Sequence, residues 1–302
     1  MTKPTTSAYL LLFFQGAIWG SSFQAIKFAL EGYGPISVAA GRIFLAAIII
    51  TFYALARGHD FPRNPRTIIF LVIVGFFNCA LPFFLISWGE QDLDTGRTAI
   101  FMATGPLIAL GIAHFSTPDE RVTFFKGIGF LMGFIGVLFV IGLETFRGEA
   151  MALLPQLAII CAATSYAISG AIAKRIENVA SSMFTACVLI SASLMTVPVS
   201  LLVEAPLQVN HSDASQSSLL AILYLGLVPT GLAFLIRFHL LRTAGYTFVS
   251  QVGYLVPMFG VLFGAIIFQE TITLPAMFGL ALILAGIFVS RLTRETLQIK
   301  RD

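Results

Sequence analysis

The segment DERVTFFKGIGFLMGFIGVLFV (residues 119–140) returns in altered form as QETITLPAMFGLALILAGIFVS (residues 269–290). Identical residues stand at a constant offset of 150 positions: Glu120 with Glu270, Gly129 with Gly279, and Gly136 with Gly286. Both segments contain an apolar stretch about as long as a membrane-crossing helix requires. The pairing indicates that the chain contains one structural unit twice.

Two more regions repeat at nearly the same offset. Pro106 and Pro257, each inside a long apolar run, lie 151 positions apart, and WGSSFQAIK (19–27) resembles YAISGAIAK (166–174) at offset 147. Single matches arise by chance in apolar, glycine-rich sequence, but three regions at similar offsets favour a repeat. Because proline removes a helix hydrogen bond and clashes with the preceding turn, we expect a paired break in the two helices at Pro106 and Pro257.

The composition is that of a membrane protein. The chain has 302 residues, of which 57% are hydrophobic and 11% charged, and its mean hydropathy is +0.90. Soluble domains carry about 25% charged residues. The three cysteines show no paired spacing, which predicts neither a disulfide nor a metal site. No basic block marks a nucleic-acid partner, and no cofactor motif is present.

Counting runs of about 20 apolar residues predicts an all-α membrane protein with ten transmembrane helices. They fall at residues 8–27, 35–57, 66–88, 94–115, 122–142, 151–173, 180–203, 217–241, 245–268 and 273–292. An N-terminal repeat (1–145) and a C-terminal repeat (146–302) then hold five spans each and form one transport domain. Because five is odd, the second repeat enters the membrane from the opposite side, as in the inverted repeats of many secondary transporters.

The distribution of basic residues predicts the orientation. With both termini in the cytoplasm, most of the 18 Lys and Arg fall on the cytoplasmic side and most of the acidic residues outside, as the positive-inside rule requires. This arrangement favours a multi-pass protein of a bacterial-type cytoplasmic (inner) membrane.

Several motifs resemble the drug/metabolite transporter superfamily, and its EamA-type exporters most closely. They are WGSSF (19–23), AAGRIFLAA (39–47) and the acidic residue before threonine in DERVT and QETIT. The chain is also similar to YddG-like amino-acid exporters. The resemblance implies a central cavity lined mainly by spans 1, 3, 4, 6, 8 and 9, with spans 5 and 10 as scaffold. TPDE (117–120) departs from the family's usual Gly-Glu ending, so that loop is given only a structural role.

The centres of the spans contain the candidate site residues. Polar groups at this depth usually face the bundle interior or a watery cavity. The candidate substrate-binding residues are Trp19, Ser22, Asn78, Thr104, Tyr166, Gln251 and Tyr254, and the candidate gating or kink residues are Pro82, Pro106, Pro229, Pro257 and Arg42. The simpler alternative for the Ser and Thr residues is a hydrogen bond within the helices, and the prolines could only hold fixed kinks.

Arg42 lies about 10 Å inside the outer end of span 2, since it follows Pro35 by seven residues at about 1.5 Å each. An arginine at this depth must face inward or extend towards the interface. One interpretation is a structural tie to carbonyls or to an outer acid such as Glu90. The other is a gate or a contact for a substrate carboxylate.

The absence of charged residues from the span centres narrows the range of possible substrates. Every acidic residue lies in a loop or at a span end, which disfavours a proton-coupled exporter of cationic drugs. Apart from Arg42 the centres also lack the cations that phosphorylated substrates favour. The pattern predicts a secondary transporter that exports small neutral or zwitterionic metabolites, most of all amino acids including aromatic ones, by alternating access. The alternatives are an exporter of other small metabolites or drugs, and a channel; no enzyme motif is present.

We expect the partners to be a small-molecule substrate and the lipid bilayer. Gly129 and Gly133 form a close-packing face on span 5. Packing of span 5 on span 10 within one chain, and hence a monomer, is favoured over a dimer built on this face.

Overall fold

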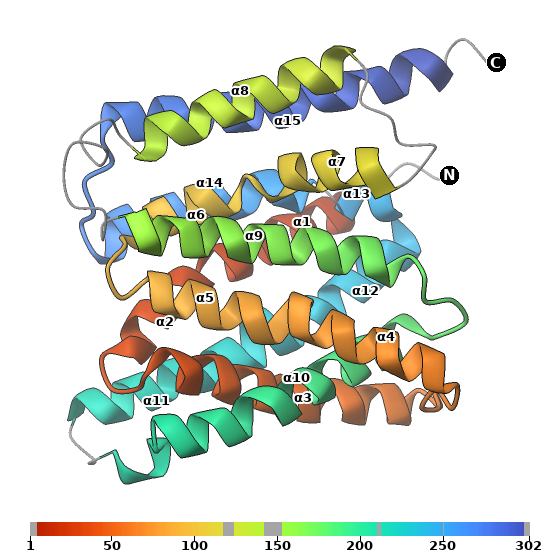
Figure 1. Ribbon diagram of the computed structural model, residues 1–302, viewed down its shortest axis with the longest axis vertical. Coiled ribbons are helices and arrows are strands. Elements are labelled where there is room, and N and C mark those ends of the chain that lie inside the picture. The colour runs from red at the N-terminus through yellow and green to blue at the C-terminus, as the bar shows by residue number, and fades with distance from the viewer. Residues whose placement is uncertain (1–4, 117–123, 142–152, 210–212, 250, 299–302) are drawn as a thin grey trace.

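The computed structural model describes residues 5–116, 124–141, 153–209, 213–249 and 251–298, and these residues contain helices and no strand. The bundle is elongated, with its helices running between two ends (Figure 1). In chain order the elements are α1 (Thr6–Gly20), α2 (Ser22–Leu30), α3 (Pro35–Ala56), α4 (Pro65–Gly75), η1 (Phe76–Ala80), α5 (Leu81–Gly89), α6 (Thr95–Met102), α7 (Gly105–Ser116), α8 (Phe124–Ile141), α9 (Leu153–Ala173), α10 (Ser181–Val203), η3 (Pro206–Gln208), α11 (Asp213–Leu225), η4 (Gly226–Leu232), α12 (Ala233–Thr243), α13 (Tyr246–Val249), α14 (Val252–Ile267) and α15 (Leu274–Gln298).

Six of the expected spans are confirmed as helical segments long and apolar enough to cross a membrane. They are Pro35–Ala56, Pro65–Gly89, Thr95–Ile112, Leu153–Ala173, Ser181–Val203 and Gln216–Thr243. Shorter apolar helices, Gly127–Val140, Val252–Ile267 and Leu274–Val289, stand where spans 5, 9 and 10 are expected. The first expected span consists of α1 and α2 with a turn at Ser21 between them. The full count of ten stays a prediction.

The helix breaks in spans 4 and 9 do not lie at Pro106 and Pro257, where the sequence predicts them. In span 4 the turn is at Ala103 and Thr104, directly before Pro106, which is the second residue of α7. In span 9 the turn residue is Gln251, and α14 continues through Pro257. The expected break at Pro257 was therefore wrong. A proline removes only one backbone hydrogen bond, and neighbouring helices can support a membrane helix around it.

Two π-helical segments occupy equivalent places in spans 3 and 8. They are η1 and η4, and a proline accompanies each: Pro82 follows η1 and Pro229 lies in η4, 147 positions later. A widened turn leaves carbonyl groups available to other helices. The Phe77 carbonyl accepts a hydrogen bond from Ser165 of α9 at 2.8 Å, and the Pro229 carbonyl accepts one from Trp19 of α1 at 2.8 Å.

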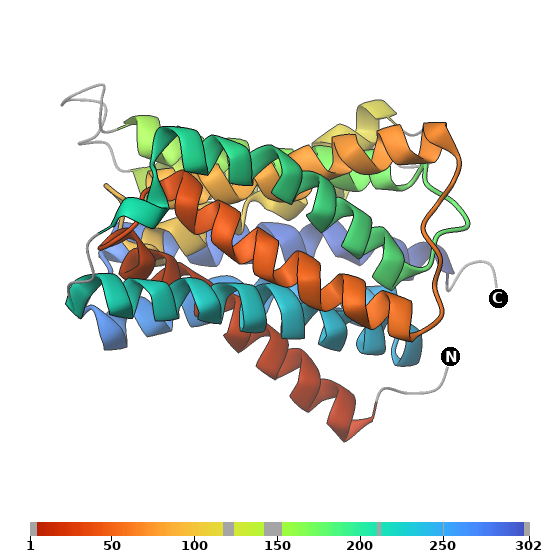
Figure 2. The ribbon, with the colours of Figure 1, turned by 90° about the horizontal axis from the view of Figure 1, so that it is seen from below.

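The helices pack as a central bundle with a separate pair at one side. The pair α8 and α15 lies along one edge in Figure 1. At the opposite edge α3 lies between α10 and the η4 region, as Figure 2 also shows. The buried apolar residues form three clusters, and one of them contains residues of both halves of the chain, with Ile26, Phe101 and Ile159 fully enclosed within it.

Glycines let α8 and α15 approach closely, which confirms the expected packing of span 5 on span 10 within one chain. A Cβ added at Gly286 would lie 2.5 Å from the Gly129 carbonyl oxygen, and one at Gly136 would lie 2.7 Å from the Gly279 carbonyl oxygen. Neither glycine can therefore accept a side chain without separating the helices.

We predict that Gly286→Ala destabilises the protein by about 1–3 kcal/mol, because the added methyl group overpacks the contact between α8 and α15. Gly170→Ala is the matched control, since a Cβ at Gly170 meets nothing within 4 Å and alanine favours the helix. Thermal unfolding in detergent measures both variants. Equal melting temperatures for the two would contradict the proposed close contact.

Candidate functional site

Arg42 is the charged centre of the candidate site. Its side chain is buried in α3, with the residue 5% exposed. Nε and Nη2 both donate to Thr230 Oγ1, at 3.2 and 3.1 Å, and the guanidinium carbon lies 3.9 Å from the centroid of the Phe83 ring. The Thr230 hydroxyl donates in turn to the Leu225 carbonyl at 2.8 Å. The widened turn η4 thus presents an oxygen acceptor to a guanidinium that rests on an aromatic face.

The guanidinium has more donors than the surrounding protein uses. An arginine side chain carries five N–H groups. Within the described residues both hydrogen bonds of Arg42 end on the single hydroxyl of Thr230. The suggested tie to Glu90 or to backbone carbonyls is not formed there. The remaining donors match what a carboxylate would accept in two parallel hydrogen bonds.

Two predicted site residues lie around this centre. Tyr166 of α9 packs its ring against Phe83, with centroids 6.5 Å apart, and it is within electrostatic range of Arg42. Asn78 of η1 donates from Nδ2 to Ser169 Oγ at 2.8 Å, and Ser169 donates to the Tyr166 carbonyl at 2.9 Å. The structure therefore brings Arg42, Tyr166 and Asn78 into one region, together with the unpredicted Phe83.

Trp19 joins the same region from α1. Its indole N–H donates to the carbonyl of Pro229, the residue before Thr230. The Arg237 guanidinium carbon lies 5.8 Å from the Trp19 ring centroid. Trp19 therefore ties the first helix to the π-helical segment that positions Thr230 beside Arg42.

The other predicted binding residues are not gathered at this centre. Ser22 and Thr104 each donate to the carbonyl three residues earlier in the same span, that of Trp19 at 2.6 Å and that of Phe101 at 2.7 Å, as the simpler alternative for such residues expects. Gln251 is exposed at the start of α14, and Tyr254 is partly buried against the core.

The predicted prolines divide into two kinds. Pro82 and Pro229 are buried and accompany the π-helical segments around Arg42. Pro106 is exposed, and its Cγ lies 4.0 Å from the position of a Cβ on Gly253, so spans 4 and 9 meet there. Pro257 is buried within α14. Their gating role stays a prediction.

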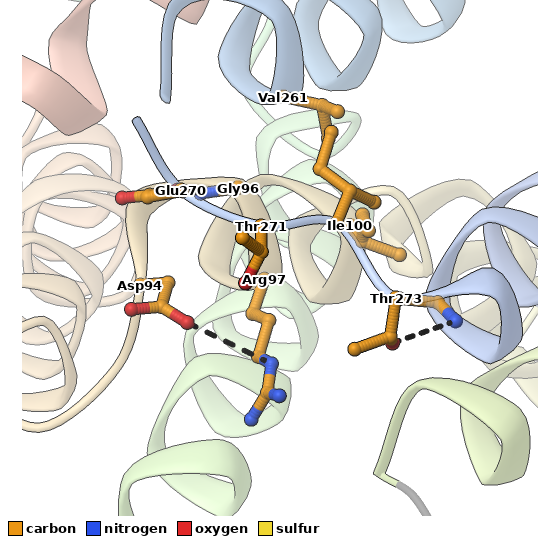
Figure 3. A pocket seen from close by; sticks show the side chains of 10 residues that line it. Asp94, Gly96, Arg97, Ile100, Val261, Glu270, Thr271 and Thr273 are labelled. Carbon is orange, nitrogen blue, oxygen red and sulfur yellow. Dashed lines mark hydrogen bonds and ion pairs between the residues drawn. The ribbon is translucent and has the colours of Figure 1, made fainter. Parts of the chain in front are cut away.

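Two acidic residues that are not among the predicted site residues connect helices at one end of the bundle. Glu270 Oε1 accepts from the Thr95 N–H and hydroxyl, and Oε2 accepts from the Gly96 N–H, all at 2.8 Å (Figure 3 shows Glu270 beside Gly96). Glu204 accepts in the same manner from the N–H groups of Ile36 at 3.0 Å and Ser37 at 2.8 Å. Each carboxylate thus caps the N-terminus of a helix from the other half of the chain, where negative charge is favourable.

A second side-chain network reinforces this end. Gln24 of α2 donates from Nε2 to Thr95 Oγ1 at 3.0 Å and to the Gly260 carbonyl of α14 at 2.9 Å. A Cβ at Gly260 would clash with the Ala99 side chain of α6. Helices α2, α6 and α14 are therefore tightly joined. The small hollow in Figure 3 has a volume of only about 10 Å³.

The opposite end contains a larger cavity of about 280 Å³. It lies between the ends of α3 and α12 and the start of α10. Its lining includes Arg57, Arg242 and His59, whose Nδ1 is 2.7 Å from Ser182 Oγ. A cavity with basic residues in its lining thus lies at this end of the bundle, and carboxylate caps join helices at the other.

Comparisons with known proteins assign the chain to a transporter group. A model of the EamA-like transporter family matches residues 6–142 and again residues 153–292. An uncharacterized transporter, YoaV of Bacillus subtilis, is 24% identical over 277 residues, covering 91% of this chain and 94% of its own. The uncharacterized inner membrane transporter YedA of Escherichia coli K12 is 23% identical over 257 residues, covering 85% and 81%.

A plant relative and a solved structure extend the similarity. The WAT1-related chloroplastic protein At3g02690 of Arabidopsis thaliana is 22% identical over 276 residues, covering 90% of this chain and 66% of its own. A solved crystal structure with 20% sequence identity superposes with a TM-score of 0.69 over 97% of this chain and 99% of the other, and supports the fold. Since the family model covers nearly the whole chain in two successive matches, the chain belongs to the EamA-like transporter family.

Proposed function

We propose that the protein is a secondary transporter that exports small neutral or zwitterionic amino acids, including aromatic ones, by alternating access. Membership in a transporter family supplies the general activity. The observation that carries the substrate class is the buried Arg42, whose unused donors suit a carboxylate. Phe83 and Tyr166 beside it offer aromatic surface for an apolar side chain.

The helix pairing supports an inverted repeat of halves 1–145 and 146–302. Equivalent spans pack on one another: α3 on α10, α6 on α14, and α8 on α15. Contacts between non-equivalent spans also occur in corresponding pairs, since α1 on α14 corresponds to α7 on α9, and α4 on α9 corresponds to α11 on α2. Such a two-fold relation lets the halves exchange conformations around a shared site.

The difference between the two ends supports a conformation closed on one side. The first turn of α1 and the last of α15 lie at the same end in Figure 1, in accord with termini on one side of the membrane. Arg57 and Arg242 at the cavity belong on the cytoplasmic side under the positive-inside rule. We therefore assign the carboxylate-capped end to the outside of a bacterial-type inner membrane and interpret the conformation as closed to the outside.

Purified protein in liposomes tests this function with a panel of labelled solutes. We expect saturable uptake of phenylalanine and other neutral amino acids, and little movement of sugar phosphates or of the carboxyl-free amine phenethylamine. Movement of phosphorylated sugars or organic cations alone would show that the substrate class is wrong. Transport of other neutral metabolites in place of amino acids would support the alternative, a general metabolite or drug exporter.

A further inference from the structure

We propose that the cavity at the end of the bundle opposite the carboxylate caps binds the phosphate group of an anionic phospholipid of the cytoplasmic leaflet. This inference goes beyond the proposed transport function and depends only on the proposed orientation. The cavity has a volume of about 280 Å³ and lies between the ends of α3 and α12 and the start of α10. The described residues that line it include Arg57 and Arg242 and no acidic residue.

The protein does not neutralise these two arginine side chains. Neither forms an ion pair or a side-chain hydrogen bond within the described residues. Both border one cavity, where their like charges repel each other unless an anion is present. Guanidinium groups bind phosphate oxygens through paired N–H donors. The charge and the donors of the cavity therefore suit a phosphate group.

The start of α10 strengthens this preference for an anion. Ala180, Ser181 and Ser182 line the cavity. Ala180 is the N-cap residue, and its side chain accepts no hydrogen bond from the first N–H groups of this 23-residue helix, whose N-terminus favours negative charge. His59 Nδ1 lies 2.7 Å from Ser182 Oγ and so joins the segment after α3 to the helix start.

The depth of the cavity favours a lipid over a soluble anion. Arg57 directly follows the membrane-capable segment Pro35–Ala56, and Arg242 is the last residue but one of Gln216–Thr243. Under the proposed orientation both arginines lie at the cytoplasmic interface, where anionic headgroups attract basic residues.

Apolar residues beside the arginines suit the rest of a phospholipid. Tyr53, Phe238 and Leu241 contribute to the lining. Phe52 and Leu55, in the last two turns of α3, are exposed at 75% and 50%. A lipid whose phosphate enters the cavity would lay its acyl chains along this apolar surface, which offers nothing to a free phosphate ion.

The proposed lipid site is separate from the candidate substrate site. Arg57 follows Arg42 by 15 residues in the same helix, a distance of about 22 Å at 1.5 Å per residue. A phosphate bound here would join α3 of the first half to α10 and α12 of the second. We therefore expect the lipid to stabilise the protein and to leave its affinity for phenylalanine unchanged.

The test uses the full-length protein, purified in detergent and stripped of lipid. Phosphatidylglycerol and phosphatidylcholine with identical acyl chains are titrated in, and the melting temperature is measured. We expect phosphatidylglycerol to raise it and to bind at least tenfold more tightly than phosphatidylcholine. Arg57→Gln and Arg242→Gln should each weaken this binding about fivefold. Arg63→Gln is the matched control, since Arg63 is an exposed arginine in the segment after α3 but does not line the cavity, and it should bind as wild type does.

Three results would overturn the inference. Equal binding of the two lipids would exclude an anion site, and equal weakening in Arg63→Gln would show only a general attraction to basic residues. Inorganic phosphate that stabilises the protein as strongly as phosphatidylglycerol at the same concentration would exclude a lipid.

Native mass spectrometry of the wild type tests the site without any variant. We expect one phosphatidylglycerol to stay bound at lipid concentrations that leave phosphatidylcholine free, and its absence would contradict the inference. Neither measurement involves a transported solute, so a failure here is distinguishable from a failure of the proposed function.

Discussion

Replacing Arg42 by glutamine is expected to abolish most transport of amino acids while leaving the protein folded. Truncating one partner of a buried, hydrogen-bonded charge pair typically costs about 2–5 kcal/mol, which corresponds to a loss of affinity of roughly 30-fold or more. Arg42→Lys should rescue only part of this loss, because lysine retains the charge but not the planar fork that binds two carboxylate oxygens. Proteoliposome uptake at a range of phenylalanine concentrations measures the change.

Two comparisons separate a carboxylate contact from a structural role for Arg42. Arg57→Gln makes the same substitution at an exposed position at the end of α3, and it should preserve the affinity for phenylalanine. Phenylalaninamide, which lacks the carboxylate, should compete poorly with phenylalanine for uptake by the wild type. For the Arg42→Gln variant the two compounds should compete about equally. Discrimination by the variant as strong as that of the wild type would remove Arg42 from substrate recognition.

Replacing Glu270 by alanine should open the capped end of the bundle. The change removes the acceptor of three hydrogen bonds and leaves the Thr95 and Gly96 N–H groups of α6 unpaired. Loss of a helix cap combined with loss of charge-assisted hydrogen bonds should lower the free energy of unfolding by about 2–4 kcal/mol. Thermal unfolding measures this, and accessibility of a cysteine introduced at Ile100, which is buried and lines the hollow beside Glu270, reports whether the end opens.

The control for Glu270 is another acidic residue at the same helix start. Asp94 is exposed and makes one ion pair with Arg97, at 3.9 Å (Figure 3), and such surface pairs contribute little. Asp94→Asn should therefore change neither the melting temperature nor the accessibility of a cysteine at position 100. If Glu270→Ala behaved like Asp94→Asn, the carboxylate caps would not be the contacts that close this end.

The sequence predicted the family and the helical class, and it singled out Arg42, the charged centre of the candidate site. Repeats and apolar runs report on spans directly, and the family match confirms the resemblance. Arg42 stood out because an arginine within an apolar helix needs a partner. That partner, Thr230, could not be assigned from sequence, since it becomes available through the π-helical segment η4, which changes the rotation of span 8.

The depth of a residue along a span did not predict which way its side chain faces around the helix axis. Ser22, Thr104 and Gln251 were all predicted near span centres, yet the first two bond the backbone of their own spans and the third is exposed. The position of Glu90 in an outer connection also failed to predict its burial, because neighbouring helices can cover the end of a span. Glu90 is completely buried where α5 packs on α9 and on α2, and no single apolar run reveals such contacts.

Counterflow in proteoliposomes tests alternating access at a carboxylate site most directly. Liposomes loaded with unlabelled phenylalanine are diluted into a trace of labelled phenylalanine, and the label inside is followed over time. A transporter with one site exposed alternately to each face should accumulate label transiently above its equilibrium level, and loading with phenethylamine in place of phenylalanine should not support this overshoot. A flux that is linear in concentration and shows no overshoot would contradict the account and indicate a channel.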